Sequence, residues 1–341
     1  MANITNGFVQ IHPSFTMPEI IMQYQQPSGA FNTLAGGSIA PKMAQGDLAV
    51  YIKRLNVKSA YQANQNAGNQ LPSCSVSAQQ ISAPTYLLRN RTIYDHHDIA
   101  AANNWGFALP EANRLAMRQG IFTGMRNGLL YGFNPQNTGE GLLNTPGAFT
   151  DTLPADTGGN TTVVTYNPGE MAQYLTQQIV QAKIRMNQMG TAARVVILGP
   201  QRCLGQWMYS IVSLTQFQLP GAGVTSTTGV TENVIGWSGD SVEWCYDDTL
   251  IGKGAGGTDA VLLVIPEIKT PYVGSKPNTN IFATLTPGTD ATTLMLSDMA
   301  APKEITSPLP DGALSTVSEI RCTPGWAIRS QGISILSMAY S

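Results

Sequence analysis

The sequence predicts an α+β protein with two parts, one built on a single long helix and the other a separate α/β domain. Three observations support this prediction: one helical pattern at residues 109–132, an alternation of helices and strands over residues 166–269, and a charged content of only 12%. Soluble proteins typically contain about 25% charged residues, which keep them in solution. A surface covered by neighbouring subunits needs less charge, so we expect extensive self-association; a low-charge globular monomer is the alternative.

Residues 1–46 show little periodicity and many turn residues, including the stretch QQPSG at 25–29 and Gly36–Gly37. Such a segment cannot bury a core of its own. An ordered irregular segment needs another surface to lie on, so we expect residues 1–46 to lie on a surface outside the segment itself.

Residues 47–57 and 86–94 have the branched and aromatic content of strands. The segment between them is polar, and no charged residue occurs between Lys58 and Arg89. Long structureless loops are unusual inside a compact domain, but a loop that lies on another subunit escapes that constraint. We therefore expect residues 47–94 to form an extended β-hairpin loop that projects from the body and packs on another subunit. A disordered surface loop is the alternative.

The long helix is predicted at residues 109–132. Pro110 and Glu111 suit its first turn, and Gly132 ends it. Its apolar positions recur at helical spacing, and they are Ala108, Ala112, Leu115, Phe122, Met125 and Leu129. At 1.5 Å per residue the helix would be about 36 Å long, enough to cross a domain.

Three glycines, Gly120, Gly124 and Gly128, line one face of this helix. Each glycine inside a helix costs about 1 kcal/mol relative to alanine. A membrane-helix interpretation is excluded by the arginines of the same segment, Arg114, Arg118 and Arg126. We therefore expect a backbone or small residues to pass close to the stripe, either from the chain's own sheet or from an arm or loop of another subunit.

The α/β part is predicted from residue 166 onward, after a short strand at 161–166. Asn167 is a good N-cap for a second helix, with Pro168 in its first turn and Glu170 completing a capping box. Strands are expected at 194–198, 241–246 and 260–265, with helices through Trp207 and over 230–237. The expected core residues are Leu175, Ile179, Val196, Ile197 and Leu262.

Residues 326–336 read as a strong closing strand, interrupted at Gly332. The long helix is followed by the glycine-rich segment GEGLLNTPG at 139–147. A long helix followed by such a segment, with the order of elements above, resembles the major capsid proteins of tailed bacteriophages, the Hong Kong 97-type fold.

The resemblance implies four regions: an N-terminal arm at 1–46, the extended loop at 47–94, a peripheral domain formed by 95–165 and 270–341 with spine helix 109–132, and an axial domain at 166–269. In this arrangement the closing strand would return to pair beside the spine helix.

The same resemblance implies a structural protein that self-assembles into homo-hexamers and homo-pentamers of an icosahedral shell. The shell would enclose phage double-stranded DNA, and it would be assembled in the host cytoplasm and become the virion capsid. The implied partners are a portal, a separate scaffolding protein, decoration proteins and, by weak nonspecific contact, the packaged DNA. A bacterial nanocompartment shell protein, similar to encapsulins, is a close alternative, and a cytoplasmic α/β enzyme or ligand-binding protein is the alternative from another class.

The sequence motifs that could indicate a catalytic, nucleotide-binding or metal site are weak. Residues 252–257 fit G-x-G-x-x-G, but a strand follows where a dinucleotide site needs a helix, so a flexible hairpin tip is expected. The sequence Asp95-His96-His97-Asp98 has metal-ligand chemistry, but adjacent side chains diverge, so we expect these residues to cap the turn before the long helix. The founding member of the family that this chain resembles joins subunits by a lysine–asparagine isopeptide bond assisted by a glutamate. Lys53 and Lys58 flank the expected loop, but no asparagine or glutamate can be matched to that set, so no cross-link is expected. We therefore expect no catalytic, cofactor-binding or metal site, and no cofactor.

The remaining sequence features exclude other classes. The formal net charge of −2 gives no support for strong nonspecific nucleic-acid binding. The chain has no signal peptide pattern and no apolar stretch of membrane-spanning length. Its four cysteines, Cys74, Cys203, Cys245 and Cys322, form no CxxC pair, so we expect free thiols.

Overall fold

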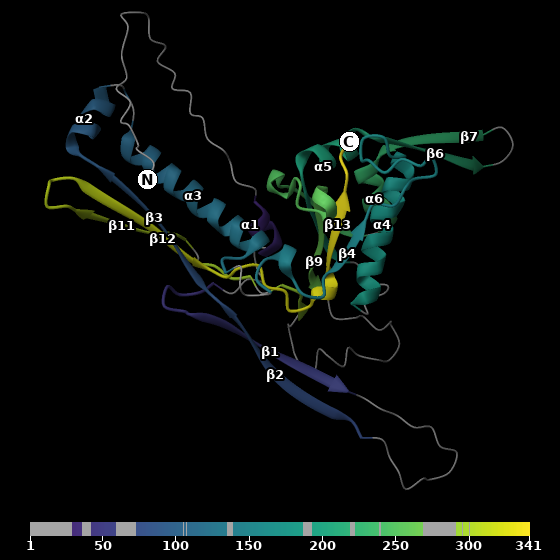
Figure 1. Ribbon diagram of the computed structural model, residues 1–341, viewed down its shortest axis with the longest axis horizontal. Coiled ribbons are helices and arrows are strands. Elements are labelled where there is room, and N and C mark those ends of the chain that lie inside the picture. Colours follow the sequence, from purple (N-terminus) through teal and green to yellow (C-terminus); the bar gives the residue numbers. More distant parts are fainter. Residues whose placement is uncertain are drawn as a thin grey trace, which may run out of the picture.

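The computed structural model describes residues 29–35, 42–58, 73–104, 106, 108–134, 139–186, 193–218, 222–238, 240–268, 291–294, 296–299 and 301–341. The chain forms two parts that lie side by side (Figure 1). One contains the long helix over a three-stranded sheet, and the other is an α/β unit around a six-stranded sheet. Two hairpins project away from these parts. Among the helices in the described ranges, none is long and apolar enough to cross a membrane.

The long-helix part contains helices α2 (His96–Asn104) and α3 (Leu109–Tyr131). Its sheet contains β3 (Tyr86–Tyr94), β11 (Lys303–Pro308) and β12 (Leu314–Cys322), in the order β11-β12-β3 with antiparallel pairing throughout. The predicted helix at 109–132 is therefore confirmed to within one residue. Its last turn is closed by Gly132, whose φ of 76° favours glycine and whose N–H bonds the carbonyl of Gly128.

The buried side of α3 agrees with the predicted one only in part, since Met125 and Leu129 are buried as expected. Met117, Ile121 and Met125 are buried, whereas Leu115 and Phe122 are 40% and 39% exposed. Apolar residues occur on two neighbouring faces of this helix, so spacing alone could not select between them. The side that packs is the one that carries the glycines.

The glycine stripe faces the chain's own sheet rather than another subunit. A Cβ on Gly120 would meet Asn90 at 2.6 Å, and one on Gly124 would meet Leu88 at 3.2 Å. Leu88 and Asn90 are alternate residues of β3 and so lie on the same face of that strand. The prediction of a close contact is confirmed, but side chains of β3 provide it at these two glycines, together with the Phe133 ring at Gly128.

The extended hairpin consists of β1 (Ala49–Lys58) and β2 (Ser75–Pro84), paired antiparallel from Ala49↔Pro84 to Lys58↔Ser75. The predicted first strand is confirmed, but its predicted partner at 86–94 is wrong. That segment is β3, which pairs with β12 in the long-helix part. The error arose because β2 (SVSAQQISAP) is polar and almost wholly exposed, so it lacks the apolar alternation of a half-buried strand.

The α/β unit surrounds a sheet in the order β4-β13-β9-β5-β8, with β10 paired to β9. Its strands are β4 (Phe149–Thr152), β5 (Arg194–Gly199), β8 (Ser241–Tyr246), β9 (Asp259–Ile268), β10 (Ala291–Thr292) and β13 (Ile333–Met338). Its helices are α4 (Pro168–Arg185), α5 (Gln201–Tyr209) and α6 (Val230–Ser238), and a second hairpin is formed by β6 (Ile211–Gln218) and β7 (Ala222–Gly229). Asn167 caps α4 through bonds from the N–H groups of Gly169 and Glu170, as predicted. The predicted capping box is wrong, because the Glu170 carboxylate accepts from Thr157 and the N–H of Asn167 donates to Asp156 instead.

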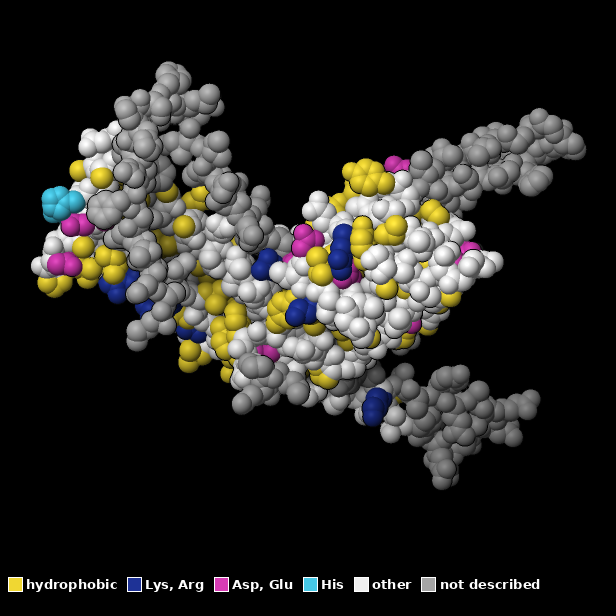
Figure 2. All heavy atoms as spheres, turned by 45° about the horizontal axis from the view of Figure 1, so that its top comes forward, with side chains coloured by type: hydrophobic (Ala, Val, Ile, Leu, Met, Phe, Trp, Pro, Cys, Tyr) yellow, Lys and Arg dark blue, Asp and Glu magenta, His cyan; other side chains and the backbone are white. Residues whose placement is uncertain are grey.

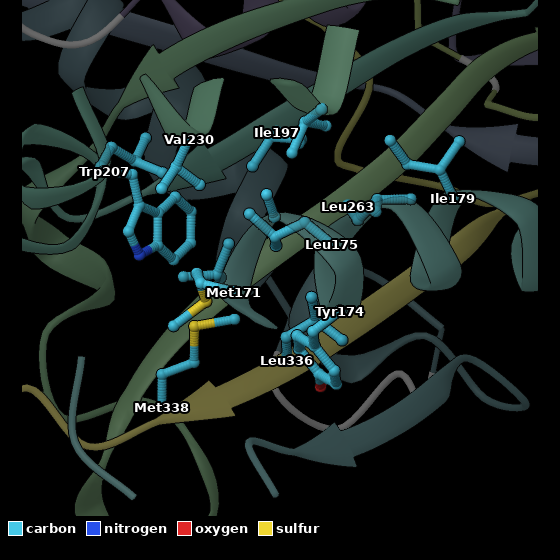
Figure 3. Packing of buried hydrophobic residues seen from close by; sticks show 14 of the residues in the cluster. Met171, Tyr174, Leu175, Ile179, Ile197, Trp207, Val230, Leu263, Leu336 and Met338 are labelled. Atoms are coloured by element: carbon cyan, nitrogen blue, oxygen red, sulfur yellow. The ribbon is translucent and has the colours of Figure 1, made fainter. Parts of the chain in front are cut away.

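Both faces of this sheet are buried. On one face, α4, α5 and α6 enclose a cluster that includes Leu175, Ile179 and Ile197 (Figure 3). On the other, Val196 and Leu262 pack against the end of α3 and against α1 (Ala30–Ala35). All five residues predicted for the core are fully buried, but alternation along β5 places them on opposite faces of the sheet.

Three expectations for this unit are wrong. Residues 161–166 form turns and one isolated bridge, Thr162↔Ala339, rather than a strand. The closing strand is shorter, Ile333–Met338, and pairs with β9 and β4 instead of lying beside the spine helix. The loop at 252–257 is not a hairpin tip, because β8 and β9 are separated by β5 and the loop crosses between them with two 3-10 turns, Asp248–Leu250 and Ala255–Gly257. The unit has a further 3-10 turn at Ser330–Gly332, just before β13. Another, Leu142–Asn144, lies in the segment after α3.

The pairing of the closing strand, β13, crosses the boundary between the peripheral and axial domains that the resemblance implies. Sheet pairing joins β4 and β13, from the segments assigned to the peripheral domain, to the strands of residues 166–269. Beside the long helix their place is taken by β11 and β12. Most of the predicted N-terminal arm at 1–46 lies outside the described residues; within it, Ala30, Phe31 and Leu34 of α1 are buried.

Candidate assembly surfaces

The β1–β2 hairpin presents two open faces. Tyr51 and Val76 are each 63% exposed, and Ala83 at the base is the only residue of β2 that is buried. The base is held by Thr85, whose N–H and hydroxyl donate to the carbonyls of Leu48 and Asp47. An isolated two-stranded hairpin is marginally stable in water, since each strand leaves one edge and both faces uncovered. This hairpin therefore gains stability from any surface that covers it.

The junction between the two parts is closed by contacts to the loop after β8. Asp247 is 2% exposed; it accepts bonds from Thr249, and Arg126 of α3 lies 3.9 Å from its carboxylate. The hydroxyl of Tyr131 donates to the carbonyl of Thr249 at 2.8 Å. These contacts anchor the end of α3 to the α/β unit, so the long-helix part and the unit keep a defined relative position.

The outer surface of the α/β unit carries exposed apolar side chains over neighbouring helices. Val180 and Ile184 of α4 are 41% and 39% exposed, and Ile235 of α6 is 41% exposed. Their surroundings are mostly uncharged, and Figure 2 shows few coloured charges on this part of the visible face. Contacts with other chains are favoured by such a surface, because little charge has to be desolvated.

A thiol and a carboxylate meet at the start of α5, but the arrangement does not suit nucleophilic chemistry. Cys203 donates to Asp259 at 3.3 Å, and Arg202 binds the same carboxylate through two nitrogens at 2.7 and 2.5 Å. Burial, with the bond to Asp259, raises the pKa of Cys203 to about 12, so the thiolate that would act as a nucleophile is scarce. The network instead fixes α5 to the beginning of β9.

A second buried acid, Glu140, lies beside the end of α3. Its carboxylate accepts from the Tyr86 hydroxyl at 2.7 Å and from the N–H of Asn134 at 3.1 Å. Burial and the adjacent carboxylate raise the pKa of Tyr86 to about 12, which keeps the hydroxyl protonated as the donor. These bonds join β3 to the segment after α3, so Glu140 holds two parts of the chain together.

The structure brings Asp95, His96 and His97 closer together than predicted. One ligand atom from each lies within 4.8 Å of the others, and the two imidazole rings are 3.9 Å apart. The Asp95 carboxylate already accepts from the backbone N–H of His96 at 2.5 Å, and both histidines are exposed. The residues cap a separate helix, α2, rather than α3. We assign no ion to them, because all three come from consecutive positions and no buried side chain orients them.

Lys53 and Lys58 both lie on β1. Lys58 is exposed and sits opposite Ser75 at the outer end of the described hairpin, and the partner of Lys53 in the register is Gln80. Sequence reasoning missed α2, β11 and β12, whose polar and short sequences give weak signals; the turn sequence PDG at 310–312 between β11 and β12 is the one local sign of that hairpin.

The fold matches those of solved capsid structures. A chain from "The capsid of Myoviridae Phage XM1" superposes with a TM-score of 0.67 and 13% identity, over 98% of this chain and 100% of that one. A chain of Gordonia phage Cozz superposes with a TM-score of 0.55 and 13% identity, over 97% of this chain and 92% of that one. A chain from the capsid of the native GTA particle superposes with a TM-score of 0.54 and 10% identity, over 97% of this chain and 95% of that one. No protein-family model and no curated protein sequence matches the chain. The chain has the fold of phage capsid proteins, as the resemblance of its sequence implied.

Proposed function

We propose that the chain is a structural shell protein that assembles into hexamers and pentamers of an icosahedral capsid enclosing phage double-stranded DNA. The observation that carries this proposal is the fold, which matches a phage capsid chain along 98% of the length of this chain. The low charge and the exposed β1–β2 hairpin agree with a surface made to be covered by other copies.

Each region has a role in the proposal. The β1–β2 hairpin is the loop that lies on a neighbouring subunit, and the α/β unit, now including β4 and β13, lies near the axes of the hexamers and pentamers. The β6–β7 hairpin extends from that unit, and no charged residue lies between Arg202 and Glu232. Five or six copies of an uncharged segment can meet around an axis without like charges facing each other. A portal, a separate scaffolding protein and decoration proteins are the further partners, and assembly takes place in the host cytoplasm.

Electron microscopy of the expressed chain tests the proposal. Closed particles with five- and six-fold clusters of subunits are expected, and nuclease-protected double-stranded DNA is expected in particles from infected cells. Closed particles that never contain a genome would favour a nanocompartment shell. A monodisperse monomer or dimer at high concentration would overturn the proposal in favour of a cytoplasmic α/β enzyme or ligand-binding protein.

The hairpin gives a sharper form of the test. Tyr51 and Val76 are exposed and lie on the same face of the hairpin, because Val76 pairs with Val57, six residues from Tyr51. Replacing both with Asp removes no contact with the chain's own core, so the monomer should keep its melting temperature. We expect the variant to form no particles, since each neighbour would have to bury two charges. Normal particles from this variant would show that this face of the hairpin stays uncovered.

A further inference from the structure

The face of the β11-β12-β3 sheet that points away from α3 is cationic. Cross-strand pairing places Arg89, Arg91 and Lys303 on this face, around Glu319. Glu319 has a side-chain exposure of 3% and is bonded by Arg89 and Gln45, so its charge is covered. All three cations are exposed. Two exposed isoleucines lie on the same face, Ile93 at 52% and Ile305 at 43%. We call this set the cationic face.

One end of the same sheet is acidic. Leu314 pairs with Tyr94, so the turn before β12 and the helix after β3 extend beyond the same end. Residues 95–104 and 309–313 contain Asp95, Asp98 and Asp311 and no lysine or arginine. Figure 2 shows acidic side chains beside the histidines at one end of the molecule, and basic side chains below them. We call this end the acidic tip.

The opposite charges do not satisfy each other within one chain. Arg91 bonds only the hydroxyl of Ser315, and Lys303 bonds the amide of Gln45. Asp98 accepts from the N–H of Asp95, and Asp311 from that of Ala313. Across the described ranges, none of these four charged side chains lies within ion-pair distance of an opposite charge. Each surface is therefore available to its complement on another molecule.

The helix of the acidic tip is only loosely packed on its own chain. None of the nine residues of α2 is buried, and its sequence is rich in alanine (HHDIAAANN). A helix of this length is marginal in water without packing. Alanine side chains allow a second surface to approach closely, and the exposed isoleucines of the cationic face offer an apolar surface of the required kind.

We propose that the acidic tip of one copy docks on the cationic face of a second copy, with α2 covering Ile93 and Ile305. The contact is heterologous, because two different surfaces of the same unit meet, and contacts of this type close into rings when the rotation allows. Charge complementarity of this kind selects the register of docking and speeds encounter. The inference rests on the proposed function, since it names the surfaces that join copies in the shell.

A charge-swap experiment on the full chain tests this contact. Arg91→Glu is expected to raise the protein concentration needed for particle assembly by about tenfold or more, the factor that corresponds to about 1.4 kcal/mol. The pair Asp98→Lys with Asp311→Lys should impair assembly similarly. Combining all three substitutions should restore assembly to near the wild-type concentration, because the interface regains opposite charges. Sedimentation and electron microscopy provide the measurement, and circular dichroism of unassembled protein confirms that each variant folds.

The matched control is Lys253→Glu, which reverses an exposed charge in the loop between β8 and β9, outside the surfaces named above, and should assemble as the wild type does. Wild-type particles together with normal assembly of Arg91→Glu would overturn this inference and leave the proposed function intact. A folded triple variant that stays unassembled would overturn it as well. Wild-type protein that forms neither particles nor smaller oligomers would overturn both.

Discussion

The backbone N–H of Gly325 donates a hydrogen bond to the carbonyl oxygen of Gly128 at 3.0 Å. Gly325 follows β12, and Gly128 lies in the last turn of α3, so the chain crosses the end of the long helix here. A Cβ on Gly325 would overlap the backbone carbonyl of Leu129, which can move only if α3 shifts. Only glycine fits at this crossing.

We predict that Gly325→Ala lowers the free energy of unfolding by at least 1–3 kcal/mol, the usual range for overpacking. Gly205→Ala is the matched control. Gly205 lies within α5, and a Cβ there would meet nothing within 4 Å. Alanine should therefore stabilise the control by about 1 kcal/mol through helix propensity. Chemical denaturation of the unassembled chain measures both, and equal effects of the two substitutions would refute the crossing.

The glycine stripe of α3 should respond in a graded way. Gly124→Leu places a large side chain against Leu88 of β3, so the unassembled monomer itself should lose about 1–3 kcal/mol. Gly120→Ala meets only the end of the Asn90 side chain, which can rotate, and its position is exposed. That variant should be neutral or slightly stabilised. A Gly124→Leu monomer that melts above the wild type would contradict the packing of α3 on β3.

Ile179→Asp and Val180→Asp form a pair of neighbours on α4 with opposite surroundings. Ile179 is fully buried under the sheet, whereas Val180 is 41% exposed. Burying a carboxylate among apolar side chains should cost Ile179→Asp several kcal/mol, and Val180→Asp should cost far less. Thermal unfolding distinguishes them. Soluble and normally assembling Ile179→Asp protein would be inconsistent with the core in Figure 3.

Asp259 should make the free energy of unfolding depend on pH in the acid range. Burial alone would raise its pKa, but the bonds from Arg202, Gly252 and Cys203, with the charge of Arg202, lower the pKa below its usual value. The contribution of a carboxylate with a depressed pKa is present above its unfolded pKa of about 3.9 and is lost as pH falls through the folded value. Asp259→Asn should be destabilised by about 1–2 kcal/mol at pH 7, because it weakens the bonds from Arg202, whose side chain is 40% exposed and stays hydrated.

The same variant should lose less stability than the wild type between pH 5 and pH 2. Denaturation at several pH values measures this difference. Parallel curves for the two proteins would show that Asp259 does not contribute to the acid response.

The cysteines should differ in reactivity. Cys74 is exposed, whereas Cys203, Cys245 and Cys322 are buried. Burial raises the pKa of Cys322 to about 12, and it raises those of the other two as well. A thiol reagent should therefore label one cysteine per folded, unassembled chain and four after denaturation. Cys74→Ser should abolish the native labelling, and rapid labelling of a second thiol would contradict the burial.

The elements that could be predicted from sequence are those with strong local signals. Helix α4 is predicted by Asn167, Pro168 and a regular apolar stripe. Strand β5 is predicted by its continuous apolar run RVVILG. The long helix was found for the same reason. Its buried face was predicted only in part, because the choice between two apolar faces depends on β3, and pairing between distant segments leaves no local trace.

The strands that were missed are polar or pair over long distances. Buried Ser318 and Thr316 of β12 have the composition of a loop, yet they lie under α3. The cationic face and the acidic tip could not be predicted either, since Arg91 and Asp311 become parts of facing surfaces only through the register of β3, β12 and the turn before it. The fold class followed from local patterns, whereas the candidate contact surfaces required the sheet.

The position of β13 controls when the α/β unit can form during synthesis. This strand fills the space between β4 and β9, both of which leave the ribosome much earlier. Until residues 333–338 emerge, β4 has no neighbour in the sheet and one edge of β9 stays open. Late, non-local pairing slows folding. A nascent chain therefore keeps the edges of β4 and β9 open until its closing strand is in place, and open strand edges are the places where pairing with other chains can begin.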